Sequence, residues 1–390
     1  MAHFEIKNLS FYYLAAPKKT ALDDVSLKIE QGEYVTVCGR SGSGKTTLLK
    51  HLKSVLAPHG KLKGEIFFQG KDLKEVDLRT QSSQIGYVMQ NPDNQIVTDK
   101  VWHELAFGLE SLGYDQKTIR LRVAEMASYF GIQDWFHRNV SELSGGQKQL
   151  LNLASIMAMQ PSALILDEPT SQLDPIAASD FLNTVRKMNR ELRTTIIITE
   201  HRLEDIFYAS DRVIVMEDGK VIANDRPENI GEFLKGENNQ MFAAMPTPVQ
   251  IYYGVHDRCI DRLNAKQTSL ICPLTVREGA EWLDKVFDGI DVKETKVEKG
   301  HKYIEEDIKD PAVELQELWF RYEKDTPDIL KGVSLKVSKN SLFAIVGGNG
   351  TGKSTTLKAI SGICKPYRGK VFIEGKRLDF TNPKQQLQVL

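Results

Sequence analysis

The run Gly39-Arg-Ser-Gly-Ser-Gly-Lys45-Thr46 constrains the fold of this chain more than any other sequence feature. It fits the pattern G-x-x-x-x-G-K-[ST]. Residues 34–38 before it predict a short buried strand, and residues 47–53 after it carry apolar side chains at helical spacing. A strand, a glycine-rich loop and a helix N-terminus direct backbone N–H groups and the helix dipole at an anion. The sequence therefore predicts a phosphate-binding loop, in preference to a glycine-rich turn that binds nothing.

The chemistry of this loop predicts a nucleotide together with a divalent metal ion. Lys45 is expected to reach the β- and γ-phosphates, and the Thr46 hydroxyl is expected to hold Mg²⁺. Tyr13, an aromatic residue ahead of the loop, either stacks on an adenine or packs within its own small sheet, and the sequence leaves both open. The residues expected to contact the nucleotide in this region are Tyr13, Gly39, Arg40, Ser41, Gly42, Ser43, Gly44, Lys45, Thr46 and Thr47.

Composition excludes several other classes of protein. The chain has 390 residues, 41% of them apolar and 26% charged, as expected for a soluble globular protein of two or three units. No apolar run approaches the ~20 residues of a membrane-spanning helix, and the first residues do not resemble a signal peptide. The four cysteines are scattered, which predicts a reducing cytoplasm without a disulfide framework or a zinc site. A net charge of −1 argues against nucleic acid as the main partner.

Two further motifs flank a helical insertion that is predicted over residues 101–131. Gln90 ends a predicted strand just before a proline-containing break, where its amide can reach a metal ion or water; a structural turn is the alternative. After the insertion, Leu143-Ser-Gly-Gly-Gln147 leads into an apolar helix at residues 150–159. Glycines at a helix start leave backbone donors free for a phosphate. Because the first loop already holds one nucleotide, a second nucleotide is expected at Ser144, Gly145, Gly146 and Gln147.

Two buried strands are predicted to bring acidic and imidazole side chains to the phosphate loop. Residues 163–166 are continuously apolar, which is typical of a buried parallel strand, and they end at Asp167 and Glu168. Asp167 is expected to support Mg²⁺ through its hydration shell and Glu168 to polarise an attacking water; a helix cap is the alternative. The strand at residues 194–199 leads to His201, which can sense a γ-phosphate by hydrogen bonding; a structural histidine is the alternative.

Taken in this order, the motifs resemble those of the ATP-binding-cassette (ABC) ATPases over residues 3–230, with Asp174 of the run Ser171-Gln-Leu-Asp174 completing the set. The resemblance implies an α/β P-loop NTPase fold with a RecA-like core, an antiparallel β-subdomain and a helical subdomain. It implies two cassettes facing head to tail, with each ATP held between one phosphate loop and the opposite Leu143–Gln147 motif. In that family's pattern Glu168 is the catalytic base of ATP hydrolysis, His201 is the γ-phosphate switch and Tyr13 is the adenine-stacking aromatic.

A narrower likeness, to the ATPases of energy-coupling-factor importers of vitamins and metals, is visible at residues 87–96, 101–110 and 198–204. In that family two cassettes, sometimes fused, drive an integral-membrane coupling protein and a small substrate-binding membrane protein. The resemblance therefore implies a peripheral ATPase at the cytoplasmic face of the cell membrane, powering uptake of a vitamin, its precursor or a metal ion. The solute itself is not identified, because specificity in this architecture belongs to the separate membrane protein.

The second half repeats the first, since Gly347-Gly-Asn-Gly-Thr-Gly-Lys353-Ser354 repeats the run at 39–46 at an offset of 308 residues. The copy stops where residues 387–390 align with 86–89, so a fragment or truncated gene product is expected, because the phosphate-loop helix lacks parallel strands to pack against. The nucleotide contacts expected in this copy are Tyr322, Gly347, Asn349, Gly350, Gly352, Lys353, Ser354 and Thr355. The metal contacts expected in both copies are Thr46, Gln90, Asp167 and Ser354.

The predicted domain organisation is a first ABC ATPase domain at 1–235, a connector at 236–311 and the N-terminal part of a second ATPase domain at 312–390. The connector carries an amphipathic helical stripe for which packing against a cassette is favoured over contact with a membrane or a partner helix. The stripe consists of Trp282, Leu283, Val286, Phe287 and Ile290.

Neither composite ATP site is complete within one molecule, so a second cassette or a homodimer is expected to complete the Lys45 site. The leading hypothesis is a transport ATPase. The alternatives are a soluble tandem-cassette ATPase that acts on ribosomes or nucleic acid, and a non-hydrolysing remnant that only binds ATP.

Overall fold

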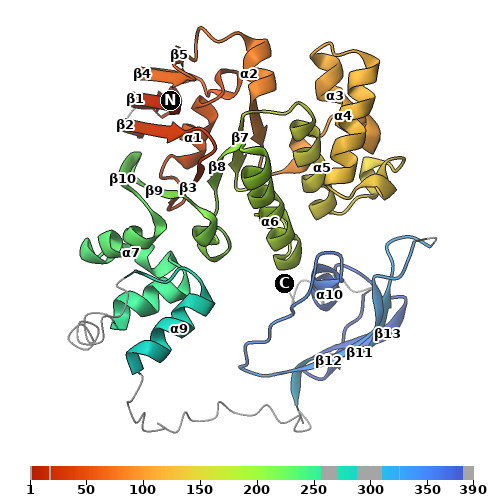
Figure 1. The fold of residues 1–390 in the computed structure, drawn as a ribbon. Helices are drawn as coiled ribbons and strands as arrows, with labels where there is room; N and C mark the ends of the chain where they lie inside the picture. The colour runs from red at the N-terminus through yellow and green to blue at the C-terminus, as the bar shows by residue number, and fades with distance from the viewer. Residues whose placement is uncertain (1, 17–18, 256–270, 288–309, 325, 381–390) are drawn as a thin grey trace. The chain divides into compact units, whose positions relative to one another are not determined.

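The computed structural model describes residues 2–16, 19–255, 271–287, 310–324 and 326–380. The chain divides into two compact units, Met1–Ile290 and Asp291–Leu390, each described by itself below (Figure 1). None of the helices in the described ranges has the length and apolar character that a bilayer crossing needs.

The core of the first unit is a mainly parallel sheet with the strand order β10-β9-β3-β8-β7-β6. Its inner strands are buried along their whole length, because their continuous apolar runs are covered on both faces. Strand β10 pairs antiparallel with β9 across a turn at Gly219 and closes one edge. The strands are β3 (Tyr34–Gly39), β6 (Ile85–Val88), β7 (Ala163–Asp167), β8 (Thr195–Thr199), β9 (Arg212–Glu217) and β10 (Lys220–Asp225).

The register of three neighbouring strands sets the position of the candidate site. Val37 of β3 pairs with Thr199 of β8, and Thr199 pairs with Asp167 of β7. The carboxyl ends of the three strands therefore lie in one row. The phosphate loop, the acidic pair and the histidine each follow one of these strands, so the sheet brings them to the same edge.

An antiparallel sheet with the order β2-β1-β4-β5 covers one face of this core. Its side chains alternate between buried and exposed, and Val25, Leu27 and Ile29 point inward to pack with Leu48 and Leu49 of helix α1. The elements of this layer are β1 (Ala2–Tyr13), β2 (Thr20–Glu30), α1 (Lys45–His51), η1 (Ser54–Leu56), β4 (Gly60–Phe68), β5 (Lys71–Asp72) and α2 (Leu78–Gln84).

The predicted helical insertion forms two helices, α3 and α4, packed against helix α5 (Figure 1). The stretch divides at Gly113, and Asp115 then caps α4 by accepting a hydrogen bond from Thr118 N at 3.0 Å. Leu105 and Leu109 are fully buried as their spacing predicts, whereas Trp102 on the same predicted face is exposed. The elements here are η2 (Pro92–Asn94), α3 (Val101–Ser111), α4 (Gln116–Tyr129), η3 (Gln133–Trp135), η4 (Val140–Glu142) and α5 (Gly145–Ala158).

The described part of the predicted connector packs on the first unit. Trp282 of α9 contacts the ring of Tyr252 with 5.0 Å between ring centroids, and Val286 is buried in the same cluster. Trp282, Leu283 and Val286 of the amphipathic stripe thus pack into the hydrophobic cluster of the first unit, as the favoured interpretation predicts. Phe287 is 38% exposed, and Ile290 lies outside the described residues. The elements on this side are α6 (Pro175–Leu192), η5 (Leu203–Asp205), η6 (Phe207–Ala209), α7 (Pro227–Gly236), η7 (Gln240–Ala244), a helix at 247–255 and α9 (Val276–Phe287).

The second unit repeats the antiparallel sheet and the phosphate-loop helix of the first. Its strand order β12-β11-β13-β14 matches β2-β1-β4-β5. Residues 342–346, which align with the buried strand β3, form no strand among the described residues, and Leu342 is fully exposed there. The alignment of residues 387–390 falls outside the described residues. The elements are β11 (Pro311–Phe320), β12 (Leu330–Ser338), α10 (Lys353–Ile360), β13 (Arg368–Ile373) and β14 (Lys376–Arg377).

Candidate functional site

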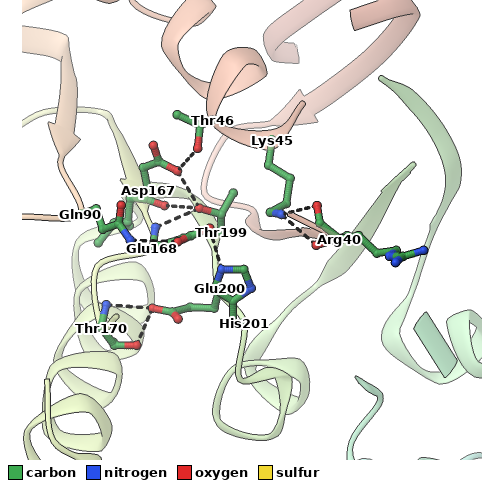
Figure 2. Close-up of polar contacts among 12 residues, drawn as sticks. Arg40, Lys45, Thr46, Gln90, Asp167, Glu168, Thr170, Thr199, Glu200 and His201 are labelled. Atoms are coloured by element: carbon green, nitrogen blue, oxygen red, sulfur yellow. Dashed lines mark hydrogen bonds and ion pairs between the residues drawn. The ribbon is translucent and has the colours of Figure 1, made fainter. Parts of the chain in front are cut away.

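The phosphate loop connects β3 to α1 and holds its own lysine inward. Lys45 Nζ donates hydrogen bonds to the carbonyl oxygens of Gly39 at 2.8 Å and Arg40 at 3.1 Å (Figure 2). The side chain is buried, and this burial lowers the pKa of Lys45, while the nearby carboxylates of Glu168 and Asp167 partly oppose the shift. The ammonium group is therefore desolvated, and its acceptors are neutral carbonyl oxygens. An anion could replace these acceptors.

The first glycine of the loop is required by both its backbone conformation and its surroundings. Gly39 has φ 147°, and a Cβ there would lie 2.2 Å from the carbonyl oxygen of Met216. Gly42 also has a positive φ, 81°, but a Cβ there would meet open space. A substitution at Gly39 therefore adds steric overlap to backbone strain, whereas a substitution at Gly42 adds backbone strain alone.

Gly39→Ala is expected to lower the free energy of unfolding by at least about 3 kcal/mol, since overlap with the β9 backbone adds to the strain of the positive φ. Gly42→Ala is the matched control and is expected to cost only about 1 kcal/mol. Denaturant unfolding of both variants without nucleotide measures the difference. Equal losses at the two positions would contradict the steric argument.

Asp167 and Thr46 form an oxygen-rich pair beside the loop. Thr46 Oγ1 donates to Asp167 Oδ1 at 2.9 Å, and Thr199 Oγ1 donates to the same oxygen at 3.0 Å. Tyr87 donates its hydroxyl to Asp167 Oδ2 at 3.2 Å. A hydroxyl and a carboxylate oxygen suit Mg²⁺, which takes few protein ligands and completes its shell with water and phosphate oxygens. Within the described residues no cluster of three or more His, Cys, Asp or Glu side chains could hold a metal ion by itself.

Glu168 meets both Gln90 and His201, although the three residues follow different strands. Glu168 Oε1 lies 2.9 Å from His201 Nε2, and Gln90 Nε2 donates to Glu168 Oε2 at 3.2 Å (Figure 2). The Glu168 backbone has φ 47°, and its N–H donates to Thr199 Oγ1 at 2.9 Å. Both carboxylate oxygens thus have partners. Gln90, which was expected to face the metal, directs its amide nitrogen at the predicted base.

Lys45, Thr46, Gln90 and Glu168 line a cleft of about 440 Å³, whereas Asp167 and His201 are not among its lining residues. Tyr13 forms part of its wall, where its hydroxyl lies 2.8 Å from Thr47 Oγ1 and its ring meets Phe11 edge-on. Tyr13 therefore packs in its sheet and also faces the cleft, so the two interpretations are compatible. The lining residues are Tyr13, Ala16, Lys19, Ala21, Ser41, Gly42, Gly44, Lys45, Thr46, Thr47, Gln90 and Glu168.

Three of the lining residues were not predicted: Ala16 and Lys19, on the segment between β1 and β2, and Ala21, at the start of β2. A signal was present in the sequence, since a basic residue in the loop directly after the candidate stacking aromatic suits a polyphosphate.

The Leu143–Gln147 motif lies outside this cleft and caps its own helix. Helix α5 begins at Gly145, earlier than the expected start at 150. Gln147 N donates to Ser144 Oγ at 3.3 Å, and Ser144 N donates to Gln147 Oε1 at 2.9 Å, which is a capping box. Asp174 likewise caps helix α6, accepting hydrogen bonds from the backbone N–H groups of Ile176 and Ala177. The hydrogen bonds given above connect these residues to their own helices, and their role in binding nucleotide stays a prediction.

Side chains of α5 bind the loop that follows Gln90. Asn152 Nδ2 donates to Gln95 Oε1 at 2.8 Å, and Gln149 Nε2 donates to the Met89 carbonyl at 3.2 Å. Lys148 adds an ion pair with Asp93 at 2.7 Å. This link was not predicted from the sequence. Its signal was the placement of two amides on the buried face of an otherwise apolar helix.

The second unit reproduces the geometry of the phosphate loop. Lys353 Nζ donates to the carbonyl oxygens of Gly347 at 2.8 Å and Gly348 at 2.6 Å, as Lys45 does with its own loop. The Tyr322 hydroxyl lies 3.4 Å from Thr355 Oγ1, matching Tyr13 and Thr47. The sequence repeat therefore extends to side-chain contacts. Gly350, Gly352 and Asn349 belong to this loop, and Ser354 to the first turn of α10.

Comparison with known proteins gives consistent results across both units. The sequence profile of the ABC transporter family matches residues 22–171 and 330–390. A relative from Bacillus cereus is 40% identical over 100% of this chain and 66% of its own length. One from Methanosarcina acetivorans is 33% identical over 95% of this chain and 61% of its own length. Both carry the name ABC transporter ATP-binding protein, itself an inference, and this chain spans about two thirds of their length.

Solved structures give the same result for the first unit. The protein cbiO1 from Clostridium perfringens, described as part of the ABC transporter complex cbiONQ, is 28% identical with a TM-score of 0.55. The match covers 68% of this chain and 99% of cbiO1. A dimeric ATP-binding cassette bound to ADP and Pi, 23% identical with a TM-score of 0.51 over 57% of this chain and 98% of its own, shares the fold.

Proposed function

We propose that this chain, which belongs to the ABC transporter family of ATP-binding proteins, is the ATP-hydrolysing subunit of a membrane import system of the energy-coupling-factor type. The observation that carries hydrolysis is the contact of Glu168 with both Gln90 and His201 at the mouth of the Lys45 cleft. A carboxylate that meets an amide and an imidazole next to a phosphate loop has the groups needed to hold and polarise water.

The loop residues bind the phosphates of ATP in this proposal. Lys45 Nζ leaves the carbonyl oxygens of Gly39 and Arg40 and pairs with phosphate oxygens, which are stronger, charged acceptors. Tyr13 lies at the adenine end of the cleft. Thr46 and Asp167, which bind each other at 2.9 Å, would hold Mg²⁺, and the ion would supply charge neutralisation at the phosphates.

Glu168 polarises the attacking water once its carboxylate is free of one partner. The water oxygen bonds to the γ-phosphorus as one of its protons passes to Glu168, and the bond to the β–γ bridging oxygen breaks. ADP and phosphate are released, and Glu168 returns the proton to phosphate or solvent. His201, 2.9 Å from Glu168 in this structure, holds the γ-phosphate when ATP is present. His201 would thus change its partner from the Glu168 carboxylate to the γ-phosphate. Hydrolysis would then depend on a correctly placed γ-phosphate.

A complete site requires a second cassette in this proposal. The Leu143–Gln147 motif does not line the cleft of its own unit. It would instead close over the phosphate loop of an opposing cassette, either the Lys353 loop or the Lys45 loop of a second copy. Closure on ATP and opening after hydrolysis would then be the motion delivered to the membrane.

A groove between the sheet core and the helical insertion provides a docking place for the membrane partner. The groove has a volume of about 510 Å³, and Phe107 and Leu78 in its wall are exposed apolar residues. Gln95 and Asn152 also line it, and these two residues bind each other in the link between α5 and the Gln90 loop. An amphipathic helix of an integral-membrane coupling protein would therefore touch the residues that position Gln90. In this proposal the chain would lie peripherally at the cytoplasmic face of the membrane.

Phe107→Glu is expected to prevent co-purification with integral-membrane subunits from detergent-solubilised membranes while ATP binding is retained. The charged side chain cannot be buried against an apolar helix without loss of several kcal/mol. Leu121→Glu on α4, exposed and outside the groove, is the matched control. Wild-type recovery of integral-membrane proteins that stimulate ATP hydrolysis supports transport. Recovery of ribosomes or nucleic acid instead would favour a soluble tandem-cassette ATPase.

A further inference from the structure

Glu200, directly after strand β8, is a buried carboxylate that the proposed chemistry does not use. Only 4% of the residue is exposed. Its Oε1 accepts hydrogen bonds from Thr170 N at 3.1 Å and from Thr170 Oγ1 at 2.8 Å (Figure 2). A carboxylate is costly to bury even when it is hydrogen-bonded, so its placement beside a candidate active site calls for a role beyond filling space.

The contacts of Glu200 close a ring around the predicted base and switch. Thr170 lies two residues after Glu168 in the chain, and Glu200 directly precedes His201. His201 Nε2 in turn lies 2.9 Å from Glu168 Oε1. Going around the ring, Glu168 connects through Pro169 to Thr170, then by hydrogen bond to Glu200, then to His201 and back to Glu168. Glu200 thus joins the two chain segments that carry the reacting pair.

Backbone and side-chain hydrogen bonds to Thr199 fix the Glu168 side of this ring. The Glu168 N–H donates to the carbonyl oxygen of Thr199 at 3.1 Å and to Thr199 Oγ1 at 2.9 Å, which ties the end of β7 to the end of β8. Beyond Glu168 the chain turns through Pro169 toward the Ser171–Asp174 segment. The Glu200–Thr170 hydrogen bonds hold this turn against the histidine segment.

The burial, neighbouring charge and hydrogen bonds of the Glu200 carboxyl group agree with a side chain that is held firmly in place. The pKa of Glu200 is raised to about 7, mainly by burial and to a smaller extent by the negative charge of Glu168, while the hydrogen bonds from Thr170 and from the His201 backbone N–H act in the opposite direction. Hydrogen bonds to a carboxylate are about twice as strong as those between neutral groups. Loss of this acceptor would therefore leave the Thr170 donors unsatisfied in a buried place.

We propose that Glu200 is a positioning residue for ATP hydrolysis: by binding Thr170 it sets the distance and orientation between Glu168 and His201. The proposal rests on the proposed function, because the pair matters only if it acts on ATP. Misplacement of a reacting group by about 1 Å can cost about 100-fold in rate. The nucleotide itself is bound by the phosphate loop, which Glu200 does not contact in the described structure.

The test compares Glu200→Ala, Glu200→Gln and Gln81→Ala in the full chain. Glu200→Ala is expected to lower kcat for ATP hydrolysis about 10- to 100-fold with KM for ATP changed less than about 2-fold. Glu200→Gln is expected to restore kcat to within about 3-fold of wild type, because an amide oxygen accepts the same two bonds.

Gln81→Ala is the matched control. Gln81 is equally buried, and its Oε1 accepts hydrogen bonds from Ser54 N at 3.0 Å and Ser54 Oγ at 2.8 Å, remote from the cleft. It is expected to lower stability about as much as Glu200→Ala while kcat stays at the wild-type value. Thr170→Val, which removes only the hydroxyl donor, serves if Glu200→Ala does not fold, and a 3- to 10-fold loss of kcat is expected.

A second readout does not need turnover. The imidazole resonance of His201, assigned by its loss in His201→Ala, is expected to move in Glu200→Ala toward its position in Glu168→Gln, and not to move in Gln81→Ala. A wild-type kcat in Glu200→Ala, or an unmoved His201 resonance, overturns the positioning role and leaves the proposed function standing. If wild-type protein with its partners does not hydrolyse ATP, the proposed function fails, and the resonance alone decides whether Glu200 positions the pair.

Discussion

Glu168→Gln is expected to lower kcat for ATP hydrolysis by about 100- to 1000-fold while ATP remains bound. The amide preserves the shape of the side chain and its hydrogen-bonding reach but cannot take a proton from water. Nucleotide affinity is expected to be equal or higher, because the substitution removes one negative charge from a cleft built for phosphates. Single-turnover hydrolysis and equilibrium ATP binding measure the two effects separately.

The control for this experiment is Glu191→Gln on α6. Glu191 also accepts a hydrogen bond from a hydroxyl, that of Tyr129 at 3.0 Å, but it lies away from the cleft. Its replacement is expected to leave kcat unchanged. Hydrolysis at the wild-type rate in Glu168→Gln would remove Glu168 from the role of base and with it the mechanism proposed above.

Lys45→Met is expected to weaken ATP binding at the first phosphate loop by about 100-fold or more. The ammonium group is the buried cation of this loop, and removing one partner of a buried charged pair typically costs about 2–5 kcal/mol. The folded protein without nucleotide is expected to be as stable as wild type or more so. The reason is that burial already lowers the pKa of Lys45, which shows that the empty loop holds its charge at a cost.

The second phosphate loop supplies the comparison for this variant. Lys353 makes the same contacts with its own loop, so Lys353→Met removes the other site. Calorimetric titration with ATP and Mg²⁺ is expected to show loss of one site in each single variant and of both in the double variant. Undiminished affinity and stoichiometry in Lys45→Met would show that the nucleotide binds elsewhere.

The sequence was sufficient to predict features that depend on local pattern. The phosphate loop has a fixed spacing, and the continuous apolar runs at β7 and β8 identify strands buried on both faces. The repeat at an offset of 308 predicted a second loop, and the structure reproduces it down to the lysine contacts. The ABC ATPase fold is confirmed by the family match and by the solved cassettes.

Contacts between segments that are distant in the chain could not be predicted from local sequence patterns. The hydrogen bond of Gln90 with Glu168 joins residues 78 positions apart, and that of Asn152 with Gln95 joins residues 57 apart. Nothing in either local sequence encodes the partner, because the meeting depends on strand order and register. The same reasoning explains residues 342–346: their sequence resembles β3, but a parallel strand needs neighbours, and none is present among the described residues.

In the capping box, Ser144 and Gln147 satisfy with each other hydrogen bonds at the start of helix α5 that a bound phosphate could otherwise satisfy. The two groups that satisfy the helix start are the ones the proposed composite site would offer to the phosphate of an opposing nucleotide. Engaging that phosphate then means exchanging one set of hydrogen bonds for another, at a cost of about 1 kcal/mol for the lost cap. Closure of two cassettes would thus begin with a small penalty, worth roughly a fivefold bias toward the open state. That penalty sets a threshold for closure. Contacts with a weakly bound or incomplete nucleotide would not offset it, whereas contacts with a full triphosphate would.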